Sequence, residues 1–481
     1  MRRTWGVLMI ALAILLVYPF AYQRIPFLKD NFNSFNLLNG VMDKKEAKKL
    51  VENVTDFKST IIAADSISLV ESDGEGEGDN APFEMSNLLD SHSNKSNIIL
   101  NPAPPIDTSQ IYSLLFRFFE ALEKAEKNEG QARIFYFGDS MIEGDLITQT
   151  LRDKLQKQFG GEGVGWVPIT SIVSRFRQTI IHSFSKNIEY QSLMKRQSKS
   201  FPIGIQGEVF KIKNDTNSTW VNYSASKAYQ KLSTFPTTRF FYYGNSNQPL
   251  NSVGTLKIKK EIISLPNEKG LNTVWISKDP SKTINATFNL NSPIGAYGFS
   301  FESKNGVILD NFSLRGSNGI SLLQISNNLI QEFNNEMNPC LIVLQYGLNV
   351  AQKNCTNYES YRIELEKLIK NFQNNCPQAS ILVMGVCDKG GKVDGEYGTE
   401  PSIPYLLEAQ KRAAANCGVA FFSLFEAMGG EGSMVRWVKE EKPALANLDF
   451  THVNGLGAAK IGNLIHAFLI NGYKDYQNKA K

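Results

Sequence analysis

Apolar residues follow two different periods along this chain, and the change of period divides the chain into parts. In residues 106–165 and again in residues 295–475, short unbroken apolar runs alternate with segments whose apolar positions recur at helical spacing. One such run, 341–346, has no polar alternation, which is typical of a strand buried on both faces of a sheet. Strands that alternate with helices predict a parallel sheet covered by helices on both faces, an α/β/α domain with three layers.

The expected elements of this domain can be stated as ranges. The predicted strands are 133–137, 298–301, 307–312, 341–346, 380–386 and 419–424. The predicted helices are 108–127, 142–159, 320–337, 358–372, 404–417 and 455–470. Sites in such folds lie at the carboxyl ends of the strands, so polar residues that follow these strands are the candidates for function.

The intervening residues, 166–294, show a different pattern. Short alternating runs rich in Val, Ile, Thr, Phe and Tyr are separated by Asn, Ser, Gly and Pro, and long helical periods are absent. This predicts an antiparallel β-sandwich inserted between the two parts of the α/β domain. Tyr242, Tyr243 and Trp275 suit either core packing or stacking on sugar rings, so carbohydrate binding is one hypothesis for the insert.

The amino terminus carries a targeting pattern. Arg2 and Arg3 precede an uncharged, largely apolar run, and about 20 such residues span a bilayer as a helix. We predict that residues 1–23 form a transmembrane signal anchor, with a cleaved signal peptide as the alternative. The rest of the chain is then exported to the periplasmic or extracellular face of the membrane. Residues 24–105 are predicted to form a membrane-proximal region and an acidic, glycine-rich linker.

Charge and cysteine content narrow the classes of function. The 51 basic and 47 acidic residues give a formal net charge of +4 without a basic stripe, so we expect no nucleic-acid partner. The five cysteines form no CxxC motif and lack neighbouring histidine pairs, so no metal site is predicted. The glycine-rich segment 160–165 follows a helical pattern and lacks the Lys-Ser/Thr of a phosphate-binding loop, and we expect no cofactor.

Candidate chemistry begins at Gly138-Asp139-Ser140. These residues follow the apolar run 133–137 and precede a helical pattern, so Ser140 is expected at the carboxyl end of a strand and near a helix N-terminus. The free N–H groups and the dipole of such a terminus stabilise the negative charge that forms when a serine attacks an ester. The same tripeptide also occurs as an ordinary turn or helix cap, so it does not identify a nucleophile by itself.

Three later segments also fall where predicted strands end or the last helix begins: 314–319, 346–349 and 449–452. They supply glycine N–H groups, the amide of Asn349, and a carboxylate beside an imidazole in Asp449 and His452. Acyl transfer needs a nucleophile, a base and oxyanion donors of these kinds. Of the four histidines, only His452 lies beside an acid at a predicted junction of loop and helix.

In this order the four segments resemble the sequence blocks of the SGNH/GDSL hydrolase superfamily. The matching residues are Gly138-Asp139-Ser140, the glycine segment 316–319, Gly347-Leu348-Asn349 and Asp449-x-x-His452. Val350 departs from the pattern, because many members have an aspartate after the asparagine. The sequence 347–351 and the inserted β-rich segment are similar to the branch that contains peptidoglycan and carbohydrate O-acetylesterases. The resemblance implies a flavodoxin-like three-layer α/β/α domain with a parallel sheet.

The resemblance also implies a Ser-His-Asp triad. Ser140 would attack an ester carbonyl, His452 would accept its proton, and Asp449 would orient the imidazole and stabilise its charged form. The plainer alternative is that Asp449 caps the last helix and His452 is a surface residue of its first turn.

Oxyanion donors are implied in the same way. The oxyanion would receive hydrogen bonds from the Ser140 N–H, from a glycine N–H and from the side chain of Asn349. Gly319 is preferred to Gly316 as that glycine, although the Gly-x-x-Gly spacing leaves both registers open. For Asn349 the alternative is a simple turn residue.

Together these features predict an exported serine esterase. It would remove O-acetyl or other short acyl groups from a cell-envelope polysaccharide such as peptidoglycan, which is the expected partner, and the N-terminal helix would contact the membrane. Two other hypotheses remain open from the sequence: a carbohydrate-binding surface protein that keeps this fold without activity, and a polysaccharide O-acyltransferase.

Overall fold

A computed structural model describes residues 108–479 except 196–198, 214–217, 245–250 and 394. The predicted signal anchor (1–23) and the predicted membrane-proximal region and linker (24–105) lie outside the described residues. Within the described part of the chain, no helix is both long enough and apolar enough to cross a bilayer.

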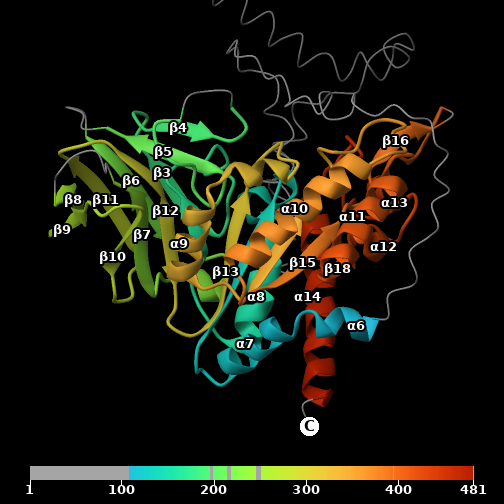
Figure 1. Cartoon of the computed structure of the whole chain (residues 1–481), viewed down its shortest axis with the longest axis horizontal. Helices are drawn as coiled ribbons and strands as arrows, with labels where there is room; N and C mark the ends of the chain where they lie inside the picture. The colour runs from blue at the N-terminus through green and yellow to red at the C-terminus, as the bar shows by residue number, and fades with distance from the viewer. Residues whose placement is uncertain (1–107, 196–198, 214–217, 245–250, 394, 480–481) are drawn as a thin grey trace, which may run out of the picture. The chain divides into compact units, whose positions relative to one another are not determined.

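A five-stranded parallel sheet forms the centre of the α/β part (Figure 1). Its strand order is β13-β1-β14-β15-β18, and each neighbouring pair is parallel. The strands are β1 (Gln131–Gly138), β13 (Gly306–Ser313), β14 (Leu341–Gln345), β15 (Ser380–Gly385) and β18 (Ala420–Ser423). The prediction of a parallel sheet is therefore confirmed, and each of these strands overlaps a predicted one.

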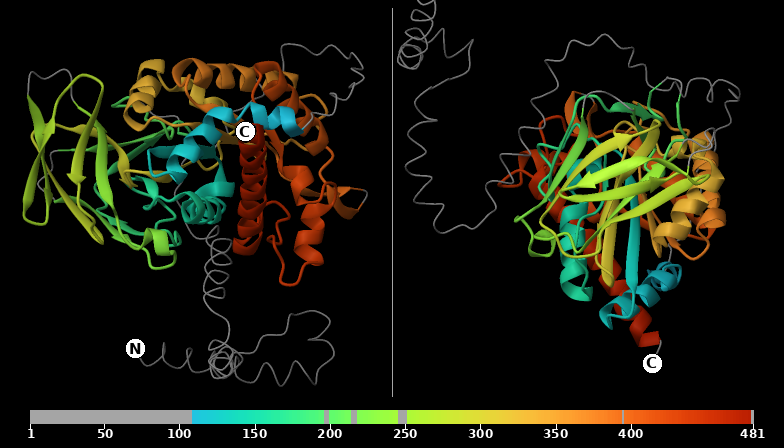
Figure 2. Two further views of the ribbon diagram at one scale, coloured as in Figure 1. Left: turned by 90° about the horizontal axis from the view of Figure 1, so that it is seen from below. Right: turned by 90° about the vertical axis from the view of Figure 1, so that its left-hand side faces the viewer.

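Helices cover both faces of this sheet. Figure 2 shows α10 (Glu359–Asn375) and α11 (Ile403–Cys417) on one side, and α8 (Thr148–Phe159) and α14 (Gly455–Lys479) on the other. The remaining helices are α6 (Thr108–Ser113), α7 (Phe116–Glu126), α9 (Asn327–Met337), α12 (Leu424–Met428) and α13 (Ser433–Lys439). The predicted helix 108–127 is thus two helices, and the last helix extends beyond its predicted end.

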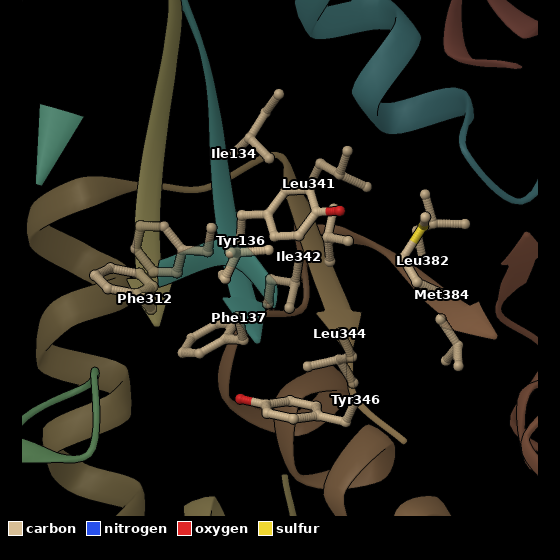
Figure 3. Packing of buried hydrophobic residues seen from close by; sticks show 14 of the residues in the cluster. Ile134, Tyr136, Phe137, Phe312, Leu341, Ile342, Leu344, Tyr346, Leu382 and Met384 are labelled. Carbon is tan, nitrogen blue, oxygen red and sulfur yellow. The ribbon is translucent and has the colours of Figure 1, made fainter. Parts of the chain in front are cut away.

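Buried aromatic and aliphatic side chains fill the space between sheet and helices. Phe137 on β1 packs on Phe312 of β13 with ring centroids 4.9 Å apart, and on Phe372 of α10 at 5.1 Å. Figure 3 shows Phe312 beside Phe137, with Leu341 and Leu344 of β14 on the other side of β1. Apolar residues alternate sides along β1, so each face of the sheet is buried and the strand pattern contains no exposed positions.

Two antiparallel sheets form the β-rich part of the chain. One has the order β10-β7-β12-β5-β4 with β2 paired to β12, and the other has the order β3-β6-β11-β8-β9. The first contains β2 (Gly165–Pro168), β4 (Glu189–Ser192), β5 (Glu208–Ile212), β7 (Thr237–Tyr243), β10 (Leu271–Ser277) and β12 (Ile294–Glu302). The second contains β3 (Ile180–Phe184), β6 (Thr219–Ala225), β8 (Ser252–Ile258), β9 (Glu261–Pro266) and β11 (Thr283–Leu290). Side chains from both sheets share one hydrophobic cluster that includes Phe240, Tyr223 and Phe288.

Strand β12 corrects one sequence assignment. The predicted strand 298–301 belongs to β12, which the hydrophobic pattern places in the α/β part beginning at 295. In the structure β12 pairs antiparallel with β2, β5 and β7. All nine of its residues are buried, because Phe299 faces the cluster between the antiparallel sheets and Tyr297 faces the core of the α/β part. A strand buried on both faces has the same unalternating pattern in either kind of sheet, so the sequence does not distinguish them.

A buried ion network joins β1 to this antiparallel strand. The Arg133 guanidinium donates from Nε to Asp310 Oδ2 at 2.7 Å, from Nη1 to Glu302 Oε2 at 2.6 Å, and from Nη2 to Ser300 Oγ at 2.8 Å. Asp310 also accepts the backbone N–H of Trp166 at 2.9 Å. Since Arg133 and Asp310 lie in the parallel sheet and Ser300 and Glu302 lie on β12, these contacts tie the two kinds of sheet together.

Candidate active site

Ser140 follows β1 directly after Asp139, at the carboxyl end of the parallel sheet. Gly138, the last residue of β1, leaves no room for a side chain, because an added Cβ would lie 2.9 Å from the Ile142 side chain and 3.1 Å from the carbonyl oxygen of Gln345. The strand can therefore approach its neighbour closely and turn at once.

The segment after Ser140 differs from the expected helix. A 3₁₀ turn covers Ser140–Asp145, with a kink at Glu143 and at Gly144, whose φ is +64°. The regular helix α8 begins only at Thr148. The prediction of a helix over 142–159 with its N-terminus near Ser140 is therefore wrong in its start, because the left-handed Gly144 separates Ser140 from α8.

Ser140, His452 and Asp449 form one hydrogen-bonded chain. Ser140 Oγ lies 3.2 Å from His452 Nε2, and His452 Nδ1 lies 2.7 Å from Asp449 Oδ2. Asp449 Oδ1 accepts the backbone N–H groups of Thr451 at 2.9 Å and His452 at 3.0 Å, so the carboxylate and the imidazole belong to one tight turn. This is the geometry required of a nucleophile, a base and a group that orients the base.

The protonation preferences of this chain follow from its contacts. The hydrogen bond to Asp449 raises the pKa of His452 above its ordinary value. Burial pushes the pKa of Asp449 upward, but the hydrogen bonds from His452 and the turn outweigh burial and hold that pKa below its ordinary value. The pair therefore favours a carboxylate beside an imidazole that accepts a proton readily.

Asp139 is a buried carboxylate beside the nucleophile. Its Oδ1 accepts the backbone N–H of Met141 at 3.0 Å, and its Oδ2 accepts Asn349 Nδ2 at 3.0 Å. Burial raises the pKa of Asp139 to about 6. Asp139 thus holds the turn and also binds Asn349 next to Ser140.

Asn349 lies at the carboxyl end of β14 with its amide directed at protein acceptors. Besides Asp139, its Nδ2 donates to the carbonyl oxygen of Ser317 at 3.1 Å. Both amide hydrogens are thus engaged, and an oxyanion would have to compete with one of these acceptors. The structure brings Asn349 to the nucleophile segment, while its role as an oxyanion donor remains a prediction.

The two candidate glycines differ in their surroundings. Gly319 has a φ of +86°, donates its N–H to Ser317 Oγ at 3.1 Å, and would place a Cβ 2.7 Å from the Tyr346 ring. Gly316 has a φ of +76°, and the atom nearest to an added Cβ is the methyl carbon of Met194 at 3.8 Å. Within the described residues, the N–H of Gly316 has no acceptor. The preference for Gly319 stays a prediction.

Arg315 and Glu143 form an ion pair at this site that the sequence motifs do not reveal. Arg315 Nη2 lies 2.7 Å from Glu143 Oε2, and the Arg315 charge opposes protonation of His452. The Glu143 side chain is only 13% exposed, so it is not the solvated acid that a first-turn position suggests. Arg315 stands directly before Gly316 in the glycine segment, and that position beside a predicted site was the available indication.

The aromatic residues proposed for sugar stacking differ in exposure. Tyr242 is fully buried, whereas Trp275 is 44% exposed and lies under the Arg239 guanidinium.

In the described part of the chain, no three His, Cys, Asp or Glu side chains gather in a group that would hold a metal ion. The five cysteines are free thiols, and Cys376 and Cys387 are buried.

Comparisons with known proteins bear on the fold. No family model and no curated protein matches the chain. Among solved structures, a peptidoglycan O-acetylesterase is similar with a TM-score of 0.61 and 19% identity, over 74% of this chain and 96% of that chain. A family two carbohydrate esterase from Cellvibrio japonicus has a TM-score of 0.26 and 10% identity, over 62% and 98% of the two chains. A putative GDSL-like lipase from Parabacteroides merdae has a TM-score of 0.25 and 12% identity, over 34% and 73%.

The last two likenesses are too low to carry an argument. The first spans nearly the whole of the similar structure and most of this chain. The chain therefore has the same fold as that structure of a peptidoglycan O-acetylesterase.

Proposed function

We propose that this protein is a serine esterase that removes acetyl or other short acyl groups from a carbohydrate. The observation that carries the proposal is the hydrogen-bonded chain from Ser140 through His452 to Asp449, with distances of 3.2 and 2.7 Å. A turn residue or a helix cap has no reason to align with a serine that lies 312 residues away in the sequence.

Catalysis would follow from the donors and acceptors of this chain. As Ser140 Oγ bonds to the ester carbonyl carbon, its proton passes to His452 Nε2, and Asp449 stabilises the imidazolium through Nδ1. The imidazolium then gives the proton to the departing sugar oxygen, which leaves an acyl-serine. Water attacks that ester while His452 takes a proton from the water. The imidazolium then returns this proton to Ser140 Oγ as the carboxylic acid leaves.

The tetrahedral oxyanion would form beside the backbone N–H of Ser140. Asn349 would contribute one amide N–H if it released Asp139 or Ser317, and Gly316 or Gly319 would contribute a backbone N–H. Each preorganised donor of this kind is worth about 3 kcal/mol in the transition state.

The proposed substrate is an O-acetylated polysaccharide of the cell envelope, with peptidoglycan as the leading candidate. The support comes from the likeness to a structure of a peptidoglycan O-acetylesterase and from the apolar N-terminal run, which predicts export. An exported, membrane-attached enzyme would meet that polymer outside the cytoplasmic membrane.

The test measures acetate release by the full chain from O-acetylated peptidoglycan and from a small acetyl ester. Ser140→Ala should abolish turnover of both, and a fluorophosphonate probe should label Ser140 in the parent protein. Ser113→Ala, which changes an exposed serine of α6, serves as the matched control. Equal turnover by Ser140→Ala would overturn the proposal, and glycan binding without turnover in the parent protein would favour a binding protein.

A further inference from the structure

The turn that carries Asp449 and His452 contains a strained residue. Phe450 lies between them with a φ of +54°, in the left-handed region that large side chains rarely adopt. The Asn447 N–H donates to the His452 carbonyl oxygen at 2.9 Å across the turn. Such strain persists only where the surrounding structure imposes it, and it is common at functional sites.

The hairpin of β16 (Gly390–Val393) and β17 (Glu396–Thr399) contacts the turn at Phe450. The Gly390 N–H donates to the Phe450 carbonyl oxygen at 2.7 Å. The Tyr397 ring stacks on the Phe450 ring with centroids 4.1 Å apart and planes 13° apart. The hairpin therefore holds both the backbone and the ring of the strained residue.

Gly390 allows this close approach. A Cβ at this position would lie 2.6 Å from the Cβ of Phe450, a distance that forces one of the two segments to move. Lys439 of α13 adds an ammonium group 5.1 Å from the Tyr397 ring and 5.8 Å from the Phe450 ring, which favours the stacked arrangement.

A buried carboxylate anchors the hairpin to α13, beside which it lies in Figure 1. Asp388 precedes β16 and accepts the backbone N–H of Met434 at 2.7 Å and the hydroxyl of Thr399 at 2.9 Å. The Glu400 N–H donates to the Lys389 carbonyl oxygen at 2.8 Å, next to these contacts. The base of the hairpin is thus tied to α13.

We propose that the β16–β17 hairpin positions the Asp449–His452 turn against Ser140, with Tyr397 as a positioning residue that acts through Phe450. Ser140 is held at the end of β1, whereas His452 lies on a turn outside the sheet, so their 3.2 Å approach depends on what fixes that turn. The role of the hairpin in turnover rests on the esterase function proposed above, whereas the effect of the hairpin on the position of the turn does not.

The charged groups around His452 make its titration a probe of the turn. Asp449 and Asp139 favour the imidazolium, and Arg315 from the glycine segment opposes it. If Phe450 relaxed to negative φ, Asp449 would move relative to His452 and their hydrogen bond would weaken. The pKa of His452 would then fall.

Four variants of the full chain test the proposal. Tyr397→Ala removes the stacked ring, and Gly390→Ala pushes on Phe450 without removing any ring. Both should lower kcat by about 10- to 100-fold while KM changes little, because the cost is misplacement of the base. Tyr397→Phe keeps the stack and should retain kcat within about twofold of the parent. Val393→Ala, on the same hairpin and 36% exposed, is the matched control and should behave as the parent.

The second measurement is the NMR titration of the His452 imidazole in the same variants. Its pKa should fall in Tyr397→Ala and Gly390→Ala and stay unchanged in Tyr397→Phe and Val393→Ala. Unchanged kcat and titration in both disruptive variants would overturn the proposal, as would equal losses in Tyr397→Phe and Tyr397→Ala. If Ser140→Ala retains turnover, only the esterase proposal fails. The hairpin proposal is still tested, because the titration of His452 reports the position of the turn without any substrate.

Discussion

Two ion pairs in this protein have the same length and opposite surroundings. His452 Nδ1 and Asp449 Oδ2 are 2.7 Å apart, with side chains that are 43% and 47% exposed. Arg133 Nε and Asp310 Oδ2 are also 2.7 Å apart, but their side chains are 1% and 0% exposed. The distance between the charges therefore does not reveal what each pair does.

The two pairs differ in their access to solvent, and this difference indicates different roles. The exposed pair is screened by water and contributes little to stability, but its imidazole can exchange a proton with a bound group. The buried pair is surrounded by further partners, since Arg133 also binds Glu302 and Ser300. Removing one member leaves a buried charge without its partner, which is strongly destabilising. On the proposed function, the exposed turn carries the chemistry, whereas the buried network joins the two kinds of sheet.

The largest expected effect comes from the exposed pair. Asp449→Asn should lower kcat by roughly 10³- to 10⁴-fold, because the amide no longer holds the required tautomer of His452 or stabilises its charge. The free energy of unfolding should change by less than about 1 kcal/mol, since the pair is exposed. Steady-state kinetics and urea titration measure the two quantities. Asp475→Asn on α14 is the control. A large loss of stability with retained kcat in Asp449→Asn would show that the exposed pair is structural and not catalytic.

The next effect tests the buried network. Arg133→Met should lower the free energy of unfolding by about 3–5 kcal/mol, because Asp310 and Glu302 remain buried without their partner. Urea denaturation measures this loss. The folded fraction should keep its kcat, since Arg133 does not contact Ser140 or His452 in the described structure. A change below about 1 kcal/mol would show that the network is not what joins the sheets.

The third effect concerns pH. His452 must be neutral to accept the Ser140 proton, and its pKa is raised by Asp449. We expect kcat/KM on an uncharged acetyl ester to rise about tenfold per pH unit below a midpoint that lies above 6.5, the ordinary value for histidine, and to level off above it. Asp449→Asn should move the midpoint downward, and a midpoint below 6.5 in the parent protein would contradict this account.

The contribution of His452 to folding stability changes with pH in the direction opposite to its contribution to activity. A histidine whose pKa is raised by folding stabilises the protein fully below the unfolded pKa, and this contribution is lost as pH rises through the folded pKa. The pair therefore stabilises the fold most at pH values where His452 is protonated and cannot act as a base.

The smallest effect sharpens the contrast between the two environments. Lys124 and Glu120 form an exposed pair on α7, 3.1 Å apart with side chains 59% and 50% exposed. Lys124→Met should change the free energy of unfolding by no more than about 0.5 kcal/mol and should leave kcat unchanged. Urea titration beside Arg133→Met gives the comparison directly, and similar losses in the two variants would remove the distinction based on burial.

Local patterns in the sequence were enough to predict the parallel sheet and the segments at its strand ends. Unbroken apolar runs such as 341–346 must be covered on both faces, and polar residues that follow such runs collect at one edge of the sheet. Ser140 and Asn349 were proposed as site residues in this way. His452 was proposed because, of the four histidines, only it stands beside an acid where the last helix begins.

Only the tertiary structure decided how these residues contact one another. It assigned β12 to an antiparallel sheet, directed Asn349 to Asp139 and Ser317, and interrupted the helix after Ser140. It also brought Tyr397 onto Phe450, two residues whose sequence neighbours give no indication of a contact. Hydrophobic period and motif spacing are local properties, whereas strand partners, hydrogen-bond partners and the strain at Phe450 depend on segments distant in sequence and adjacent only after folding.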